Sequence, residues 1–164
     1  MNLYNLHSNP KELYGFDIAP KVPELAYGLA KSNPELRHKL EPVIMKDPRS
    51  AYSYAYRVLG HRWPDAEQYI MRDPRWAWQY IVDILRRRWP EAEPYIMKDP
   101  LHAYEYAYYI LKRPWPEAEP YIMENPALAC FYAEHVLRRR WPEAEPYIMK
   151  EPDLWRKYKE RYKL

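Results

Sequence analysis

A thirteen-residue sequence occurs twice in this chain of 164 residues, as RWPEAEPYIMKDP over 88–100 and as RWPEAEPYIMKEP over 140–152. Its Trp-Pro and Ile-Met pairs recur at one fixed interval along the chain. The Trp-Pro pairs begin at Trp63, Trp89, Trp115 and Trp141, and the Ile-Met pairs at Ile44, Ile70, Ile96, Ile122 and Ile148. Every interval is 26 residues, for example from 89 to 115. A fixed period of this length is typical of repeat arrays, in which each unit packs against its neighbours.

The second half of each unit predicts a long helix that begins at a proline. The residues before these prolines are Asp47, Asp73, Asp99, Asn125 and Glu151. A residue before proline avoids helical dihedral angles, as a helix N-cap does, and proline suits the first helical position. In the run over 74–88, Ala77, Ile81, Ile84 and Leu85 share one face, with Tyr80 at its edge. We expect the arginines after Leu85 in the last helical turn, where cations oppose the helix dipole.

The first half of each unit predicts a shorter helix, such as PEAEPYIMK from Pro90. Pro94 is accommodated only within a first turn, because a proline further along would remove a hydrogen bond of the helix. Ala92, Tyr95 and Ile96 still form an apolar stripe. We therefore expect about two turns, partly in 3₁₀ geometry. Neither helix can bury its stripe alone, so neighbouring units must supply a shared core.

The predicted fold is all-α, a right-handed α-solenoid of about five to six two-helix repeats that forms a single domain over 1–164. Residues 1–22 are expected to form an N-terminal cap and residues 23–152 the repeats. A weaker unit, PELAYGLA from Pro23, aligns with PRSAYSYA from Pro48. Residues 153–164 are expected to form a basic C-terminal capping helix, because Lys159 and Lys163 occupy positions that are apolar in the preceding unit.

The repeated sequence resembles two groups of repeat proteins. Short and long helices that alternate and meet at Asp-Pro resemble the leucine-rich-repeat-variant and HEAT-like α-solenoids. The phrase RWPEAEPYIMKDP, followed by AYxYA and VL, is similar to a repeat of uncharacterised proteins from large tailed bacteriophages and some bacteria. That second resemblance covers roughly residues 41–152. It implies an intracellular phage or bacterial repeat protein and brings no catalytic or binding residues. The units are rich in Tyr and Trp where the solenoid families favour Leu.

Composition narrows the class of protein further. There are 18 Tyr, 7 Trp and 18 Pro but only 3 Gly, which disfavours β-sandwich architectures and glycine loops. A net charge of +3 does not by itself indicate a nucleic-acid partner. The single cysteine excludes an internal disulfide and favours a reducing compartment. We expect a cytoplasmic protein without secretion signal or membrane span, located in the bacterial host cytoplasm if it is encoded by a phage.

Comparison of the units separates constant from variable positions. Tyrosine is constant at Tyr54, Tyr80, Tyr106, Tyr132 and Tyr158, and methionine at Met45, Met71, Met97, Met123 and Met149. Both rows are interpreted as core packing. Four positions of the long helix change freely, namely those equivalent to 49, 50, 53 and 57, and we call them the variable face. At about 100° per residue they fall within one arc, so they predict one exposed stripe across successive units.

The variable face is either an unconstrained solvated surface or a binding surface. Its large and apolar members favour binding. The candidate partner-binding residues are Arg57, Arg75, Trp76, Gln79, Asp83, His102, Glu105, Tyr109, Leu128, Phe131 and His135. We expect a non-enzymatic scaffold that binds another macromolecule, a protein, through this face. If the chain is a phage protein, an accessory role on a host factor follows.

Cations recur at the junction after each long helix and predict a ridge that could hold phosphates. Its candidate anion-binding residues are Arg62, Arg86, Arg87, Arg88, Lys112, Arg113, Arg138, Arg139 and Arg140. Together with the basic tail, residues 153–164, this ridge defines the alternative function, which is binding of nucleic acid or a nucleotide. The competing interpretation is that these cations cap helix ends and pair with the acids that follow, such as Glu91 and Glu93.

Catalytic constellations are almost absent from the sequence. No Ser-His-Asp arrangement and no glycine-rich phosphate loop is present. His102 and His135 lie in neighbouring units, but without a second cysteine or a helical His pair no metal site is expected. Cys130 replaces an aromatic residue of other units and is interpreted as half-buried packing. We therefore expect no enzyme activity, no cofactor and no metal.

Overall fold

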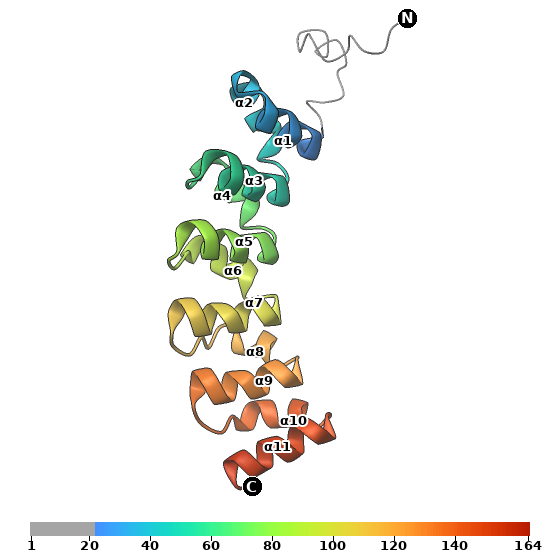
Figure 1. Cartoon of the computed structure of the whole chain (residues 1–164). Helices are drawn as coiled ribbons and strands as arrows, with labels where there is room; N and C mark the ends of the chain where they lie inside the picture. The colour runs from blue at the N-terminus through green and yellow to red at the C-terminus, as the bar shows by residue number, and fades with distance from the viewer. Residues whose placement is uncertain (1–21) are drawn as a thin grey trace, which may run out of the picture.

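The computed structural model describes residues 22–164. Every regular element in that range is a helix, so the all-α prediction is confirmed. The predicted N-terminal cap at 1–22 lies outside the described residues except for Val22. Pairs of helices follow one another along a single axis from α1 to α11 (Figure 1). The solenoid arrangement and its right-handed sense stay predictions.

Long helices lie side by side along this axis. They are α3 (Pro48–Tyr54), α5 (Pro74–Tyr80), α7 (Pro100–Glu105), α9 (Pro126–Tyr132) and α11 (Pro152–Tyr162). The first four continue as π-helical segments over Ala55–Leu59, Ile81–Leu85, Tyr106–Leu111 and Ala133–Leu137. Each long helix contacts the next one. The π-helical halves were not predicted, because apolar periodicity does not distinguish a hydrogen bond to residue i−4 from one to i−5.

Shorter helices join the long ones. They are α2 (Arg37–Ile44), α4 (Pro64–Ile70), α6 (Glu93–Ile96), α8 (Glu119–Ile122) and α10 (Glu145–Ile148). The 3₁₀ turns Pro34–Leu36, Pro90–Ala92 and Pro142–Ala144 lead into α2, α6 and α10. The expected mixture of 3₁₀ and α geometry is therefore confirmed. The helix α1 (Pro23–Ser32) packs on α2 in the same way, before the first Asp-Pro junction.

The residue before each proline caps the long helix that follows, as predicted for Asp and Asn. The Asp47 carboxylate accepts a hydrogen bond from the Ser50 backbone N–H at 2.7 Å. Asn125 accepts from the N–H groups of Ala127 and Leu128, both at 3.1 Å. These bonds satisfy donors that a helix leaves unpaired at its start. Glu151, which replaces Asp in the last unit, makes no such bond.

The long helices end at a left-handed residue, and this corrects the prediction that the arginines occupy the last turn. Gly60 has φ 71°, and its equivalents Arg86, Lys112 and Arg138 have φ of 51°, 53° and 54°. The Arg86 N–H still bonds back to the Ile81 carbonyl at 2.7 Å, which closes the helix. The cations after it therefore belong to an extended linker, since a left-handed residue ends the helix.

The core is one continuous cluster that runs through the units. The constant tyrosines lie at its centre: Tyr54, Tyr80, Tyr106 and Tyr132 are fully buried. The prediction that Tyr80 lies at the edge of the buried face is therefore wrong. The methionine row packs against the margin of the core, and Met149 in the last unit is exposed. A constant residue type thus marks a structural position here, but not always the most buried one.

Each buried tyrosine joins three parts of the array. The Tyr106 hydroxyl accepts a hydrogen bond from the Trp89 backbone N–H at 2.9 Å and donates one to the Glu93 carboxylate at 2.9 Å. The Tyr106 ring also packs against the ring of Trp115 in the next unit, with centroids 5.2 Å apart. Glu93 in turn receives two hydrogen bonds from Arg88. The repeated RWPEAE phrase therefore encodes a polar network that connects one unit to the next.

The same network recurs along the stack. Tyr80, Tyr132 and Tyr158 accept from the backbone N–H of Trp63, Trp115 and Trp141, each at 2.7 Å. The Trp N–H would otherwise be a buried donor without an acceptor. Two members depart from the pattern. Pro114 stands where three other units have arginine, and Glu119 bonds to Tyr132 without an arginine partner among the described residues. In the first unit Leu36 and Arg37 replace the Arg-Trp pair, and Tyr54 still donates a hydrogen bond to Glu41.

Replacing Tyr106 by Phe should destabilise the fold by about 1–3 kcal/mol, because the Trp89 N–H loses its acceptor and Glu93 loses a donor. Urea unfolding followed by circular dichroism measures this change. The matched control is Tyr108→Phe, which alters an exposed ring and should shift the free energy of unfolding by less than about 0.5 kcal/mol. Equal effects of the two substitutions would show that the buried hydroxyl contributes nothing.

Deletion of one whole unit, residues 74–99, should leave a folded and less stable chain, because the flanking units present matching surfaces. Deletion of 74–86 removes the long helix but keeps its short partner, and should abolish cooperative unfolding. Thermal melting of both deletion variants makes the comparison. Similar melting curves would contradict the 26-residue register.

Candidate functional site

Aromatic side chains form a row across the outer side of the long helices. We call this set the aromatic row. Its members are Tyr52, Tyr56, Trp76, Trp78, Tyr104, Tyr108, Tyr109, Phe131 and His135. They come from α3, α5, α7, α9 and the π-helical segments that follow. Every member contacts another ring of the row, so the side chains support one another.

The row begins with a contact between the first two long helices. The rings of Tyr52 and Trp76 stack with centroids 5.5 Å apart. The Tyr52 hydroxyl donates a hydrogen bond to the Asp83 carboxylate at 2.6 Å, and Gln79 donates a second at 2.9 Å. Burial and the bond to Asp83 raise the Tyr52 pKa above its ordinary value, so this phenol stays protonated. These contacts hold Gln79 and Asp83 against the preceding unit.

The row continues through the middle of the stack. Trp78 lies 6.4 Å from the ring of Tyr109, which in turn meets Tyr108 edge-on at 4.8 Å. The next step crosses to α9, where His135 lies 5.9 Å from Tyr108 and 6.1 Å from Phe131. These centroid separations fall in the range preferred by aromatic pairs. Five rings from three long helices therefore form one connected group.

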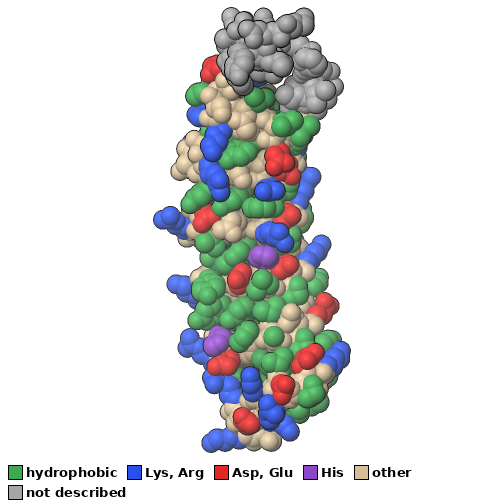
Figure 2. Space-filling model, turned by 45° about the vertical axis from the view of Figure 1, so that its right-hand side comes forward, with side chains coloured by type: hydrophobic (Ala, Val, Ile, Leu, Met, Phe, Trp, Pro, Cys, Tyr) green, Lys and Arg blue, Asp and Glu red, His purple; other side chains and the backbone are tan. Residues whose placement is uncertain are grey.

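Ring contacts do not bury this group. Tyr109 is 57 % exposed, Phe131 49 % and Tyr56 48 %. Figure 2 shows hydrophobic side chains over the middle of the stack and Lys and Arg side chains recurring along one edge. Large aromatic side chains that are ordered by their neighbours and still reach solvent form a surface patch of the kind that marks interaction sites.

The variable face was predicted to be exposed at all four positions, and this is wrong for the position equivalent to 50. Ser50 is only 4 % exposed, and the His102 side chain 13 %. Trp76 and Leu128 at the same position pack partly against the core. The reason is that the first turn of each long helix packs against the preceding long helix. The His102 ring moreover lies 2.7 Å from the carboxylate of Asp99, its own N-cap residue, so this side chain is held at the start of the helix.

The other variable positions reach the surface to different degrees. Arg57, Arg75, Tyr109 and Phe131 are exposed, whereas Gln79, Asp83, Glu105 and His135 are half-buried. Burial raises the pKa of Glu105 above its ordinary value. The structure thus brings Tyr109, Phe131 and His135 together, and leaves Arg75 outside the aromatic row.

Tyr56 and Tyr108 were missed in the sequence. Their position holds Tyr56, Val82, Tyr108, Glu134 and Glu160, so it varies as freely as the four that were chosen. It lies four residues after the half-buried aromatic position 52, and therefore shares its side of the helix. Variation at this spacing was the signal that could have identified both tyrosines.

The predicted basic ridge separates into three kinds of cation. Arg62, Arg88 and Arg140 bind Glu67, Glu93 and Glu145 through two hydrogen bonds each, so they belong to the network of the fold. Arg86, Lys112 and Arg138 are the left-handed residues at helix ends. Arg87, Arg113 and Arg139 are exposed in the linker. For the last two groups, the described part of the chain supplies no ion-pair partner within 4.0 Å.

Other candidate chemistry is scattered over the described residues. Within 22–164 no group of three His, Cys, Asp or Glu side chains is placed to hold a metal ion. His102 pairs with Asp99, whereas His135 lies in the aromatic row. Cys130 is half-buried, and burial raises its thiol pKa to about 11, which leaves little thiolate at neutral pH.

Comparison with known proteins yields no relative: no protein-family model, curated protein or solved structure matches the chain. No helix between residues 22 and 164 is long and apolar enough to cross a membrane. Any function must therefore be argued from the surface itself.

Arg140→Gln should make the stability of the fold less sensitive to acid. The hydrogen bonds from Arg140 hold the Glu145 pKa below its ordinary value, against the opposing effect of burial. A lowered pKa adds stability above the ordinary glutamate value of about 4.3, and this stability is lost as the pH falls through the pKa of the folded state. The urea midpoint of the variant should therefore lie furthest below that of the parent chain near pH 7, and the difference should shrink toward pH 3.

Arg139→Gln is the matched control, since Arg139 has no ion-pair partner among the described residues. Its urea midpoint should follow that of the parent chain at every pH. A constant deficit of the Arg140 variant from pH 7 to pH 3 would argue against the Glu145 pairing as its cause.

Proposed function

We propose that this chain is a non-enzymatic helical-repeat scaffold that binds another protein through the aromatic row and the exposed part of the variable face. One observation carries the proposal: exposed aromatic side chains contact one another across several units, on the side where the units differ in sequence. A solvated face would not need rings such as Tyr109 and Phe131, and their exposure costs solubility.

The geometry favours a protein partner for physical reasons. Tyrosine and tryptophan provide large contact areas with few rotatable bonds, so little conformational entropy is lost when a partner covers them. Here neighbouring rings already restrict those rotations, as between Tyr108 and Tyr109. Acidic and basic groups, including Asp83 and Arg57, lie beside the rings and can supply orientation.

Binding of nucleic acid or a nucleotide is the second candidate. It is favoured by the cations that lack ion-pair partners in the described residues, namely Arg86, Arg87, Lys112, Arg113, Arg138 and Arg139. The basic tail would add to their charge. This function predicts association that weakens steeply with salt.

The similarity of the repeat to phage and bacterial repeats suggests the setting. In this proposal the chain acts in the bacterial cytoplasm, as an accessory protein that engages a host factor. The absence of a catalytic constellation in the sequence supports a binding role over an enzymatic one.

Site-specific photo-crosslinking tests the surface directly. A photoreactive phenylalanine analogue at Tyr109 or at Phe131 should crosslink a protein in cells, and the same analogue at the exposed residue Glu124 should not. Glu124 lies between α8 and the N-cap Asn125 of α9, outside the long helices that carry the aromatic row. Identical adducts from all three positions would reject the proposed surface.

Tyr109→Ala combined with Phe131→Ala should lower the amount of captured partner at least tenfold. Loss of two interface aromatics costs more than about 1.4 kcal/mol, which corresponds to that factor. Helicity should be unchanged because both side chains are exposed. Trp76 is unsuitable for this test, since it packs partly against the core and its loss would also weaken the fold.

A further inference from the structure

A cation occupies a backbone position that is suited to glycine in three units. Gly60 takes the left-handed conformation at the end of its long helix, and Arg86, Lys112 and Arg138 take the same conformation at equivalent positions. Glycine adopts these angles without steric conflict, whereas a residue with a Cβ atom does not. A long cationic side chain is therefore present in these units despite its conformational cost.

Helix capping alone does not account for these cations. A cation near a helix C-terminus opposes the helix dipole. However, the residues that follow are also cationic, as with Arg87 after Arg86 and Arg139 after Arg138. These neighbours could serve the same purpose with an ordinary backbone. Opposition to the helix dipole therefore does not by itself require a cation at the left-handed position.

Their side chains border hollows between the ends of neighbouring long helices. Arg86 borders a hollow of about 330 Å³ with Tyr56 and Asp83. Lys112 and Arg138 border a second one, of about 570 Å³. Arg138 also borders a third, of about 340 Å³. Such hollows therefore recur along one edge of the stack, and each contains a cation from the left-handed position.

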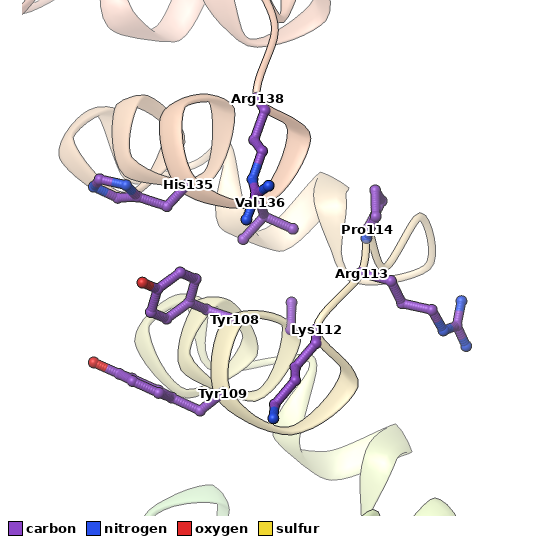
Figure 3. Close-up of a pocket in the computed structure, with 9 residues that line it drawn as sticks. Tyr108, Tyr109, Lys112, Arg113, Pro114, His135, Val136 and Arg138 are labelled. Carbon is purple, nitrogen blue, oxygen red and sulfur yellow. The ribbon is translucent and has the colours of Figure 1, made fainter.

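The hollow bordered by both Lys112 and Arg138 combines positive charge with aromatic side chains. Figure 3 shows Arg138 extending from the end of its helix into the space toward the neighbouring long helix. Tyr108 and His135 face each other across this space, with ring centroids 5.9 Å apart (Figure 3). Tyr109 and Lys112 line the same hollow from the other helix. Charged and hydrogen-bonding groups here lie directly beside apolar ring surface.

The spacing of these cations suits an extended peptide. Packed helices lie about 8–10 Å apart, so equivalent side chains of neighbouring units recur at that distance. An extended chain advances about 3.3 Å per residue, so every third residue spans one unit. A peptide with acidic residues at every third position could therefore place one carboxylate on each cation, while its other side chains meet the aromatic row.

Acidic groups beside the cations favour a peptide over a nucleic acid. Asp83 borders the same hollow as Arg86, and Glu134 borders one with Arg138. A continuous phosphate backbone would be repelled by these carboxylates, whereas a peptide places its charges individually. The formal net charge of the chain is only +3. The distribution of charge therefore matches a peptide whose acidic residues are separated by uncharged ones.

We propose that Arg86, Lys112 and Arg138, with the neighbouring aromatic side chains, form a groove that binds an extended acidic segment of a partner protein, with one carboxylate per unit. This inference rests on the proposed protein-binding function and identifies the chemistry of the partner. The left-handed cations fix the register of the peptide, and the rings Tyr108 and Tyr109 contact its apolar residues.

The test uses the full chain and a variant with Arg86→Gly, Lys112→Gly and Arg138→Gly. Because Gly60 shows that the position accepts glycine, this variant should melt at the same or a higher temperature. The probe is a fluorescein-labelled peptide with four Glu-Ser-Leu repeats. Fluorescence anisotropy should show at least tenfold weaker binding to the variant, and binding to the parent chain that weakens with added salt.

A charge-matched control replaces Lys46, Lys98 and Lys150 by Gln, on the side of the short helices. Both variants lose three positive charges, so the formal net charge falls from +3 to 0 in each. The control should bind the spaced peptide as tightly as the parent chain. An equal loss of peptide affinity in both variants would overturn the proposal, because net charge alone would then explain the binding.

Two further probes complete the comparison. A peptide of the same composition with its four Glu residues adjacent should bind at least threefold more weakly than the spaced peptide. Equal binding of the two peptides, or tighter binding of a twelve-nucleotide single-stranded DNA, would overturn the proposal. Absence of peptide binding would also overturn it. If crosslinking from Tyr109 and Phe131 persisted in that case, the proposed function would stand without this inference.

Discussion

The hydroxyl of one buried tyrosine in each unit is the interaction on which the array depends. The Trp-Pro pair begins a short helix and leaves the backbone N–H of its tryptophan buried in the molecule. The Tyr106 hydroxyl accepts a hydrogen bond from that group in Trp89 and donates one to the Glu93 carboxylate. Its ring meanwhile contacts Trp115 of the next unit. One side chain thus satisfies a buried donor and fixes the position of the neighbouring unit, which leucine could not do.

A core that is fixed in this way allows the outer side of the long helices to vary. The constant tyrosine faces inward at every unit, positions 52 and 53 and most of their equivalents are half-buried, and positions 56 and 57 and most of their equivalents reach the surface. On that side the helices carry rings that contact one another, such as Tyr108 and His135. The units therefore share one internal network and carry different side chains on the outer surface, which is the usual division in repeat proteins.

The clusters of basic residues show how position changes the role of one residue type. Arg88 is held by Glu93 and belongs to the fold. Arg87 lies exposed in the linker, and Arg86 occupies the left-handed end of the helix. Sequence alone treats these three neighbours as one ridge. The direction of each side chain, set by the end of the helix and by the turn that follows, separates a structural ion pair from cations without an ion-pair partner among the described residues.

The sequence by itself determined the 26-residue period, the all-α class, the two helices of each unit and the helix starts at Asp-Pro. These features are local: proline restricts the residue before it, and apolar spacing reveals one buried face. The tertiary structure alone decided that Ser50 and His102 lie against the preceding long helix, and that Tyr108 meets His135. It also decided which arginines are paired and that Arg86 is left-handed. Such facts depend on how the side chains of neighbouring helices approach in space. These particular contacts join different residue types in different units, so they leave no periodic signal in the sequence.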